Sequence, residues 1–183
     1  MKIFSGFFKF LKSIVLSIWA VLCSFGVDTW LFGEKPNVSW VEKAFHLQLD
    51  GATVNEAWDT HGGFLGDGTT YINLSLSNSI EDQIISINAE YAGETKGGPW
   101  YDITAYPLAY ASMKEQVIDY RGDLNELIDM GVENGYFCLI NNFDNKDEYV
   151  FITEDKAFGW FYNWELAVYD MDDMKLHYYE SDS

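Results

Sequence analysis

Apolar and polar residues alternate along much of this chain, as is typical of strands that bury one face. The alternation is clear over residues 45–49 and again over residues 71–77, and each segment is predicted to be a strand. Residues 52–59 have the composition of a further strand. Because the tight-turn signal Gly66-Asp67-Gly68 separates residues 52–59 from residues 71–77, we expect these two strands to pair as a hairpin.

Other segments carry helical signals. Ser79 is placed to cap a helix with acidic residues in its first turn, and isoleucines spaced by three or four residues continue that helix to about Tyr91. The fold class that the pattern predicts is α+β: a mainly antiparallel β-sheet built from hairpins with one or two packed helices, preceded by an N-terminal hydrophobic helix. Short helices are also predicted over residues 39–44 and 123–130, residues 113–120 fit either a helix or a strand, and strands are predicted over residues 135–140, 164–169 and 176–179.

The N-terminal segment has a different pattern, because residues 13–27 contain no charge and two lysines, Lys9 and Lys12, directly precede them. A basic stretch before an apolar run is typical of a signal peptide, with cleavage expected near Gly26. Extended back over residues 7–27, the run also approaches the ~20 residues of a membrane-spanning helix. Residues 1–32 are therefore expected to be a membrane anchor or signal segment. Residues 33–183 are expected to form a domain facing outside the cell membrane, or a secreted one.

The charge of the chain narrows the classes of partner. Its 29 acidic residues all lie from Asp28 onward, and the formal net charge is −18. Such a charge disfavours nucleic acid, whose binding depends on neutralising phosphates. It suits a basic protein partner, a divalent cation, or solubility alone. Disorder does not explain the acidity, because hydrophobic residues make up 48% of the chain and can form a core.

The run from Asp59 to Gly68, DTHGGFLGDG, combines glycines, carboxylates and a histidine. Asp59 and His61 are two residues apart and would share one face of a strand, where the carboxylate could orient the imidazole as a general base. Asp67 would approach from across the turn, so Asp59, His61 and Asp67 are candidate catalytic residues or metal ligands. The alternative is structural: His61 hydrogen-bonds a bulge formed at Gly62-Gly63, and the glycines serve the backbone geometry.

The same run resembles a motif found in a widespread group of small proteins from Gram-positive bacteria. Residues 134–137, 166–170 and 177–180 also fit this group, which ends in an aromatic β-hairpin, and the resemblance spans roughly residues 45–182. It implies a shared fold unit but no mechanism, since no activity is assigned to the group. Members commonly carry a second histidine where this chain has Leu65, so a two-histidine metal or proton-transfer site would be incomplete here.

Several other residues are candidate sites. Trp160 and Trp164 belong to an aromatic cluster that is either an exposed binding patch or part of the core, and Gly62, Gly63 and Phe64 are further binding candidates. Cys138 stands in an apolar run, which predicts a buried, unreactive thiol. The acidic loop over residues 144–148 has the composition of a calcium site but lacks the ligand spacing of an EF-hand.

These observations predict a membrane-anchored or exported acidic domain that acts by binding, with an immunity-type or inhibitor protein as the sharpest form of the idea. No cofactor is expected, although a divalent cation is compatible with the charge. The alternative is a metal-binding protein or a hydrolase that uses Asp59, His61 and Asp67.

Overall fold

The computed structural model describes Ser17 and residues 36–61, 68–92, 98–119, 131–142, 148–157 and 163–182. The chain divides into two compact units, residues 1–35 and 36–183, and all the helices and strands named here belong to the second unit. Their order is α3 (Val38–Phe45), β1 (Thr53–Asp59), β2 (Gly68–Ser75), α4 (Glu81–Tyr91), β3 (Trp100–Asp102), α5 (Pro107–Asp119), β4 (Gly135–Asn141), β5 (Glu148–Tyr149), β6 (Trp164–Asp170) and β7 (Lys175–Asp182).

The described strands form one antiparallel sheet with the order β1-β2-β7-β6-β4-β3, and β5 pairs with β4. Consecutive hairpins build most of it, since β1 pairs with β2 and β6 pairs with β7. The two hairpins meet where β2 pairs with β7 along its whole length. This architecture confirms the predicted α+β class with a mainly antiparallel sheet, and the described residues contain three helices.

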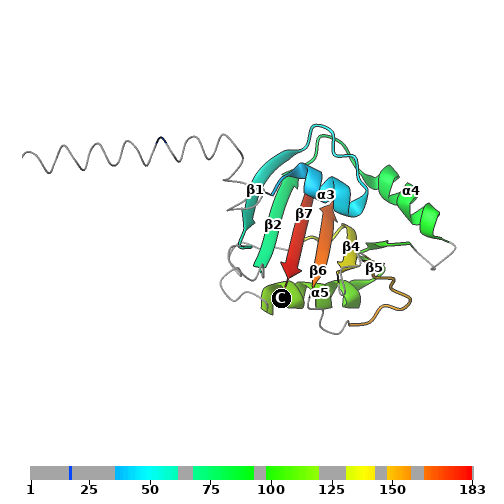
Figure 1. Cartoon of the computed structure of the whole chain (residues 1–183). Helices are drawn as coiled ribbons and strands as arrows, with labels where there is room; N and C mark the ends of the chain where they lie inside the picture. Colours follow the sequence, from blue (N-terminus) through cyan, green and yellow to red (C-terminus); the bar gives the residue numbers. More distant parts are fainter. Residues whose placement is uncertain are drawn as a thin grey trace, which may run out of the picture. The chain divides into compact units, whose positions relative to one another are not determined.

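Helices cover both faces of this sheet (Figure 1). One face, called here the α3 face, packs against Val41 and Phe45 of α3 and against Ile84 and Ile87 of α4. The other, called the α5 face, packs against α5, whose Ala109, Tyr110, Met113 and Val117 follow helical spacing. Strand β6 contributes to both layers, which explains why its residues from Leu166 to Tyr169 are all almost fully buried. Such a strand appears in the sequence as a continuous apolar run.

The β1–β2 hairpin confirms the predicted pairing of these two segments. A register irregularity lies between Val54 and Glu56, near the start of β1. The predicted bulge at Gly62-Gly63 and the predicted turn at Gly66-Asp67-Gly68 lie outside the described residues, except that Gly68 begins β2.

The strand predicted over residues 45–49 is wrong, because α3 extends to Phe45 and the chain then leaves the helix without joining the sheet. His46 takes the left-handed conformation that ends many helices, with φ 54°, and the backbone N–H of Leu47 donates to the carbonyl of Glu42 at 3.1 Å. Leu47 and Leu49 are nevertheless only 4% exposed. Their alternation reflects a connection that packs onto the core rather than a strand.

The two other helices begin with different caps. The N-cap residue of α4 is Ile80 and not the predicted Ser79, and Ile80 makes no side-chain capping bond; the hydroxyl of Ser79 nevertheless accepts a hydrogen bond from the backbone N–H of Glu81 at 3.2 Å. Helix α5 starts at Pro107, a residue favoured at the first helical position. Asp155, distant in sequence, accepts hydrogen bonds from the N–H groups of Leu108 and Ala109 at 2.9 and 3.0 Å. The ambiguous residues 113–119 therefore belong to a helix.

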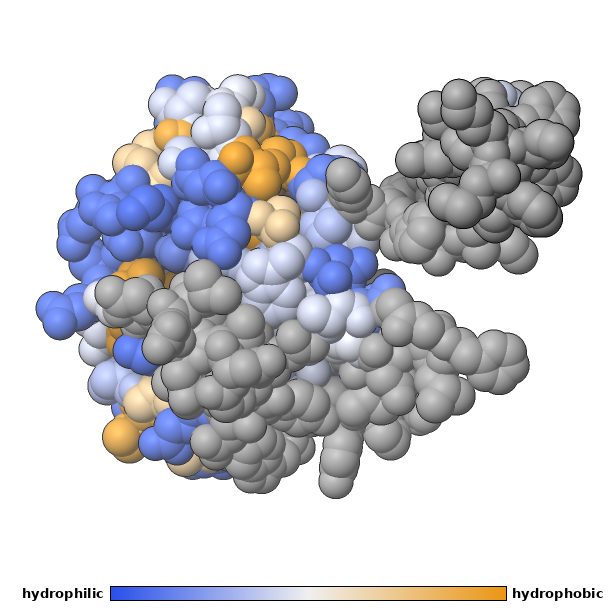
Figure 2. Space-filling view, turned by 90° about the vertical axis from the view of Figure 1, so that its left-hand side faces the viewer, coloured by the Kyte–Doolittle hydropathy of each residue, from blue (hydrophilic) through white to orange (hydrophobic). Residues whose placement is uncertain are grey.

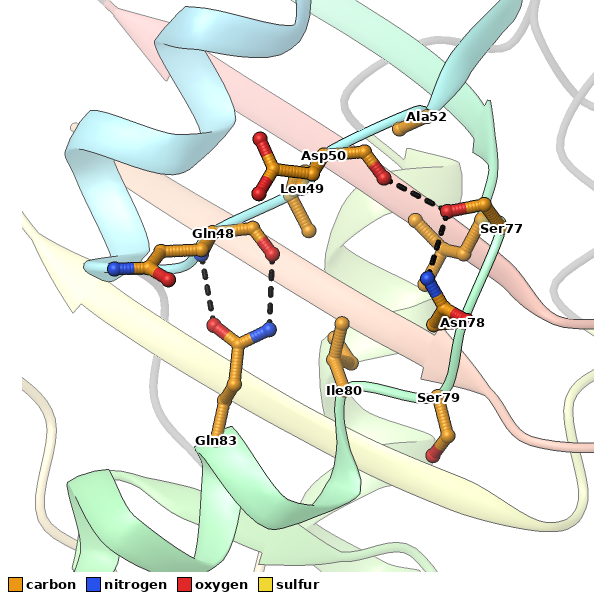
Figure 3. A pocket seen from close by; sticks show the side chains of 10 residues that line it. Gln48, Leu49, Asp50, Ala52, Ser77, Asn78, Ser79, Ile80 and Gln83 are labelled. Carbon is orange, nitrogen blue, oxygen red and sulfur yellow. Dashed lines mark hydrogen bonds between the residues drawn. The ribbon is translucent and has the colours of Figure 1, made fainter.

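Side-chain bonds tie α4 to the connection that follows α3 (Figure 3). The amide of Gln83 accepts from the backbone N–H of Gln48 at 2.8 Å and donates to its carbonyl at 2.9 Å. The hydroxyl of Ser77 donates to the carbonyl of Asp50 at 2.7 Å. These donors and acceptors bond to one another. We therefore attribute the cleft of about 180 Å³ that they border to the docking of the two segments, and not to a ligand site.

The N-terminal predictions concern residues that, apart from Ser17, lie outside the described part of the chain. Within the described ranges, no helix combines the length and apolar character that a membrane crossing needs.

Candidate functional site

One row of residues runs across four neighbouring strands on the α3 face of the sheet. The strand register pairs Asp59 of β1 with Thr70 of β2, Thr70 with Glu180 of β7, and Glu180 with Glu165 of β6. Neighbouring strands lie ≈ 4.7–4.9 Å apart, so these four side chains are lateral neighbours. We call this set the acidic row.

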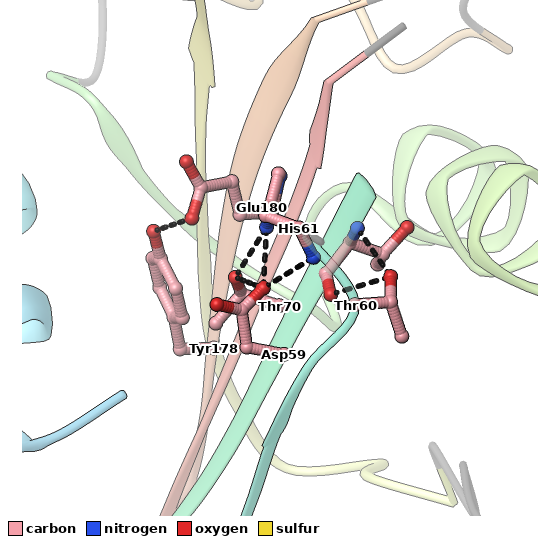
Figure 4. Close-up of polar contacts among 7 residues, drawn as sticks. Asp59, Thr60, His61, Thr70, Tyr178 and Glu180 are labelled. Atoms are coloured by element: carbon pink, nitrogen blue, oxygen red, sulfur yellow. Dashed lines mark hydrogen bonds and ion pairs between the residues drawn. The ribbon is translucent and has the colours of Figure 1, made fainter. Parts of the chain in front are cut away.

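At the β1 end of the row, Asp59 and His61 are in direct contact (Figure 4). The same oxygen of Asp59, Oδ1, lies 2.5 Å from Nδ1 of His61 and accepts the backbone N–H of His61 at 2.8 Å. The Thr70 hydroxyl lies 3.4 Å from that oxygen and 3.3 Å from the ring nitrogen. A carboxylate is an acceptor, so this geometry places a proton on Nδ1 and fixes the ring orientation.

The surroundings of His61 restrict its use as a base. Nδ1 faces Asp59, and Nε2 is shielded from solvent. Gly68 lies so close that a Cβ atom there would stand 2.6 Å from the backbone nitrogen of His61 and 2.7 Å from Cγ of its ring. The hairpin backbone also holds this end together, because Thr60 and Thr69 exchange hydrogen bonds. The arrangement therefore fits a rigid structural contact better than an accessible general base.

Most of the other predicted site residues cannot be placed. Asp67, Gly62, Gly63, Phe64 and Trp160 lie outside the described residues. Within the described ranges, no three or more His, Cys, Asp or Glu side chains are grouped in a way that could hold a metal ion.

Trp164 is placed clearly, and its position does not fit the predicted surface-binding role. It begins β6 and is only 3% exposed, packed in the apolar cluster of the α5 face with residues such as Leu166 and Tyr179. Trp164 is buried because it alternates with Leu166 and Val168 along β6, so that all three side chains point to the same covered face of the sheet. Cys138 is fully buried as predicted, and burial raises the pKa of its thiol well above the ordinary value.

At the other end of the acidic row, on β7 and β6, two carboxylates converge on one phenol. The hydroxyl of Tyr178 lies 3.1 Å from Oε2 of Glu165 and 3.1 Å from Oε2 of Glu180 (the Glu180 contact is drawn in Figure 4). The amide of Asn142 donates to the other oxygen of Glu165 at 2.8 Å. Burial, followed by the negative charges of Glu165 and Glu180, raises the pKa of Tyr178 far above its usual range. The phenol therefore stays protonated and acts as a donor between two acidic groups.

This pair of carboxylates borders a cleft of about 450 Å³ between α3 and the sheet, called here the α3 cleft. Tyr178 is buried beneath it, and Trp40 of α3 and Tyr149 of β5 are partly buried along it. The complete lining is Trp40, Lys43, Ala44, His46, Ile140, Tyr149, Glu165, Tyr178 and Glu180. Within the described residues, Lys43 forms no ion pair with either glutamate, and both Lys43 and His46 are exposed. The cleft thus combines aromatic walls with two acidic groups.

Sequence reasoning did not find this cleft. One signal was available, because Tyr178 lies in the strand predicted over residues 176–179 and Glu180 directly follows it, so the two would share a face if the strand continued by one residue. Glu165 and the residues of α3 gave no comparable signal, since they reach the site only through the pairing of β6 with β7 and the docking of α3.

One side of the described surface is largely polar. In the view onto the side that carries the β1 edge, hydrophilic residues occupy most of the described surface, and apolar residues appear in small groups (Figure 2). Together with the net charge of −18, this surface favours long-range attraction of cations over apolar docking.

Comparisons of the chain with protein-family models, with curated proteins and with solved structures gave no match.

Proposed function

We propose that residues 36–183 form an acidic binding domain for a basic protein partner, with the α3 cleft receiving a lysine or arginine side chain. The observation that carries the proposal is the convergence of Glu165 and Glu180 on the Tyr178 hydroxyl beside a cleft with aromatic walls. Carboxylates supply the charge and hydrogen-bond acceptors that an ammonium or guanidinium needs. Aromatic faces attract the same cations through their ring quadrupoles.

The size and charge of the domain support this choice. A cleft of about 450 Å³ is larger than one basic side chain, so it can also accept the neighbouring backbone of a partner. The acidic excess would draw a basic protein toward the site and raise its association rate at low salt. An immunity-type or inhibitor protein, exported or held at the outer face of the membrane by residues 1–32, is the biological role that we infer.

The test is calorimetric titration of the full chain, in detergent, with a short acetylated and amidated lysine peptide. Replacing both acids, Glu165→Gln with Glu180→Gln, removes the charge and keeps the shape. We expect the affinity to fall about tenfold or more, because a lost charged hydrogen bond costs about 1.5–3 kcal/mol. Glu115→Gln is the matched control, since this exposed residue lies on α5 against the opposite face.

Two outcomes would contradict the proposal. One is equal binding of the peptide by the wild type and the double variant. The other is a control variant that weakens binding as much as the double variant does, because general acidity rather than the α3 cleft would then explain the attraction. Binding by the cleft should also weaken less steeply with salt than binding to exposed charges, since partly buried pairs are screened less.

The second candidate is a metal-binding protein or hydrolase that uses Asp59, His61 and Asp67. The observation in its favour is the short contact between Asp59 and His61. Thermal unfolding of the wild type and of His61→Ala, with EDTA and then with Ca²⁺, Zn²⁺ or Mn²⁺, tests it. A bound metal raises the unfolding midpoint by mass action, and the rise must disappear in the variant. An unchanged midpoint with every metal would reject the metal-binding form.

A further inference from the structure

The two glutamates of the α3 cleft stand directly opposite each other in the sheet. Glu165 of β6 pairs in register with Glu180 of β7, so their Cβ atoms lie about 4.5–5.5 Å apart on one face. Like charges in this position destabilise a sheet. Both side chains are only partly exposed, so salt screens their repulsion less than it would on an open surface.

Three oxygen atoms at this place have fewer protons than their contacts can use. The Tyr178 hydroxyl lies 3.1 Å from Oε2 of Glu165 and 3.1 Å from Oε2 of Glu180. The phenol has one proton and can make one full hydrogen bond. When both glutamates are ionised, one carboxylate oxygen therefore faces the lone pairs of the phenol. A further proton, held by that glutamate, donates to the phenol oxygen and completes the second contact.

The two glutamates therefore titrate as a coupled pair. The charge of the first carboxylate disfavours the ionisation of the second, as it does wherever two carboxylates share a site. The amide of Asn142, which donates to the other oxygen of Glu165 at 2.8 Å, favours the ionised form of Glu165. The phenol does not relieve the repulsion by losing its own proton, because burial, followed by the two negative charges, holds the pKa of Tyr178 far above its usual range.

Other titratable groups face this pair from neighbouring elements. Cys138 of β4 and Tyr149 of β5 stay protonated, because burial raises the pKa of each and the charge of Glu165 adds to the shift. Toward β1, Thr70 separates Glu180 from the contact of Asp59 with His61.

Helix α3 brings two more groups to the cleft. Lys43 and His46 both line it and are exposed. Lys43 contributes a positive charge that does not change in weakly acidic solution. A histidine ordinarily titrates in that range, so His46 is the group whose proton must be distinguished from that of the glutamates.

Building on the function proposed for the α3 cleft, we propose that Glu165 and Glu180 share one proton while the cleft is empty, and that a bound lysine side chain displaces it. The exchange is balanced: the singly protonated pair takes up one ammonium group and releases one proton to the solvent, which leaves two carboxylates beside one cation. The ammonium supplies the donors that replace the lost proton. By linkage, acid weakens the binding of the basic partner, so the cleft holds its partner at neutral pH and releases it in acid.

The test uses the full chain in detergent with the acetylated and amidated lysine peptide described above. Calorimetric titration from about pH 5 to about pH 7, in buffers that differ in ionisation enthalpy, counts the protons released on binding. We expect the release to approach one proton per peptide where the empty pair is singly protonated. In that range, Kd should rise by up to about tenfold for each unit by which the pH falls.

Two variants decide which group carries the proton. Glu180→Gln removes one carboxylate of the pair and should abolish the release. His46→Asn removes the competing imidazole and should retain the release; asparagine tolerates the left-handed conformation of this position, with φ 54°. Glu115→Gln, the exposed control on α5, should release protons as the wild type does.

A measurement without peptide keeps the test decisive where a variant binds too weakly for calorimetry. The carboxyl carbon signal of Glu180, assigned by NMR with the Glu180→Gln variant, should take up its proton at a higher pH in the wild type than in Glu165→Gln. The reason is that the second variant removes the like charge opposite Glu180. Proton uptake at the same pH in both proteins would overturn the proposal.

The calorimetric outcomes separate the proton exchange from the binding function. A wild type that binds the peptide with the same enthalpy in every buffer would overturn the exchange and leave the binding function standing. Release that persists in Glu180→Gln and vanishes in His46→Asn would also overturn the exchange, because the proton would then belong to the histidine. A wild type that binds no peptide at any pH of the series would reject the binding function, and the exchange with it.

Discussion

The phenol shared by two carboxylates can be tested by removing one oxygen atom. Tyr178→Phe deletes the hydroxyl that lies 3.1 Å from both Glu165 and Glu180 and changes the buried ring very little. No cavity is expected, so the measured cost reports the polar contact rather than packing. The side chain is 3% exposed, and water cannot readily replace the lost donor.

The expected loss follows from the number of protons. A phenol has one proton and can make one full hydrogen bond, although two acceptors are within reach. A hydrogen bond to a charged group contributes about 1.5–3 kcal/mol, so Tyr178→Phe should lower the free energy of unfolding by that amount and not by twice as much. Combining Tyr178→Phe with Glu180→Gln should cost less than the sum of the single changes, because the two residues interact directly.

Urea unfolding at neutral pH, followed by tryptophan fluorescence, measures these free energies. The slope with urea should be the same in all variants, since the surface exposed on unfolding does not change. A cost below about 0.5 kcal/mol for Tyr178→Phe, in the range of ordinary surface substitutions, would refute the reasoning. Strict additivity of Tyr178→Phe and Glu180→Gln would refute it equally.

Three further predictions concern the rest of the domain. Gly68→Ala should lower the free energy of unfolding in urea by about 1–3 kcal/mol, because the added Cβ would meet the backbone of His61. A loss no greater than that of the exposed Ser86→Ala variant would contradict this close approach. Stability should fall as the pH rises from about 10 to 12. Buried tyrosines with raised pKa values, such as Tyr101 at about 12, keep their protons in the folded state, while the unfolded chain loses them near 10; unfolding free energies that do not decline over this range would disprove the reasoning. The Cys138 thiol should react with a maleimide only at the rate of unfolding, and fast labelling of the native protein, measured by mass spectrometry after proteolysis, would argue against its complete burial.

The local pattern of the chain was sufficient for the hairpins. Residues 52–59 and 71–77, separated by turn-forming glycines, pair as β1 and β2, and residues 164–169 and 176–179 pair around an acidic turn as β6 and β7. These contacts join neighbours in sequence, so alternation and turn chemistry specify them. The contact of Asp59 with His61 is also local, but the predicted shared strand face is not its cause: β1 ends at Asp59, and Oδ1 of Asp59 accepts the backbone N–H of His61 two residues beyond it.

Local pattern failed where distant segments decide the structure. Leu47 and Leu49 alternate like a strand, yet no strand edge is available to them, and they are buried by a connection that crosses the core. The sequence did not distinguish a helix from a strand over residues 113–120, because either element would place Met113 and Val117 on one buried face. The start of α5 at Pro107 and the cap from Asp155, across 47 residues of sequence, resolve the question.

The sequence by itself determined the acidic charge, the antiparallel hairpins and the local contact of Asp59 with His61. Only the tertiary structure decided which side chains meet in the clefts on the two faces of the sheet. Glu165 and Glu180 reach Tyr178 because β6 and β7 pair in one register, and a slip by one residue would send each side chain to the other face of the sheet. Glu56 and His177 border one cleft on the α5 face because β2 joins two hairpins that are far apart in sequence. Burial on both faces of the sheet selects that register, and burial is a property of the whole fold.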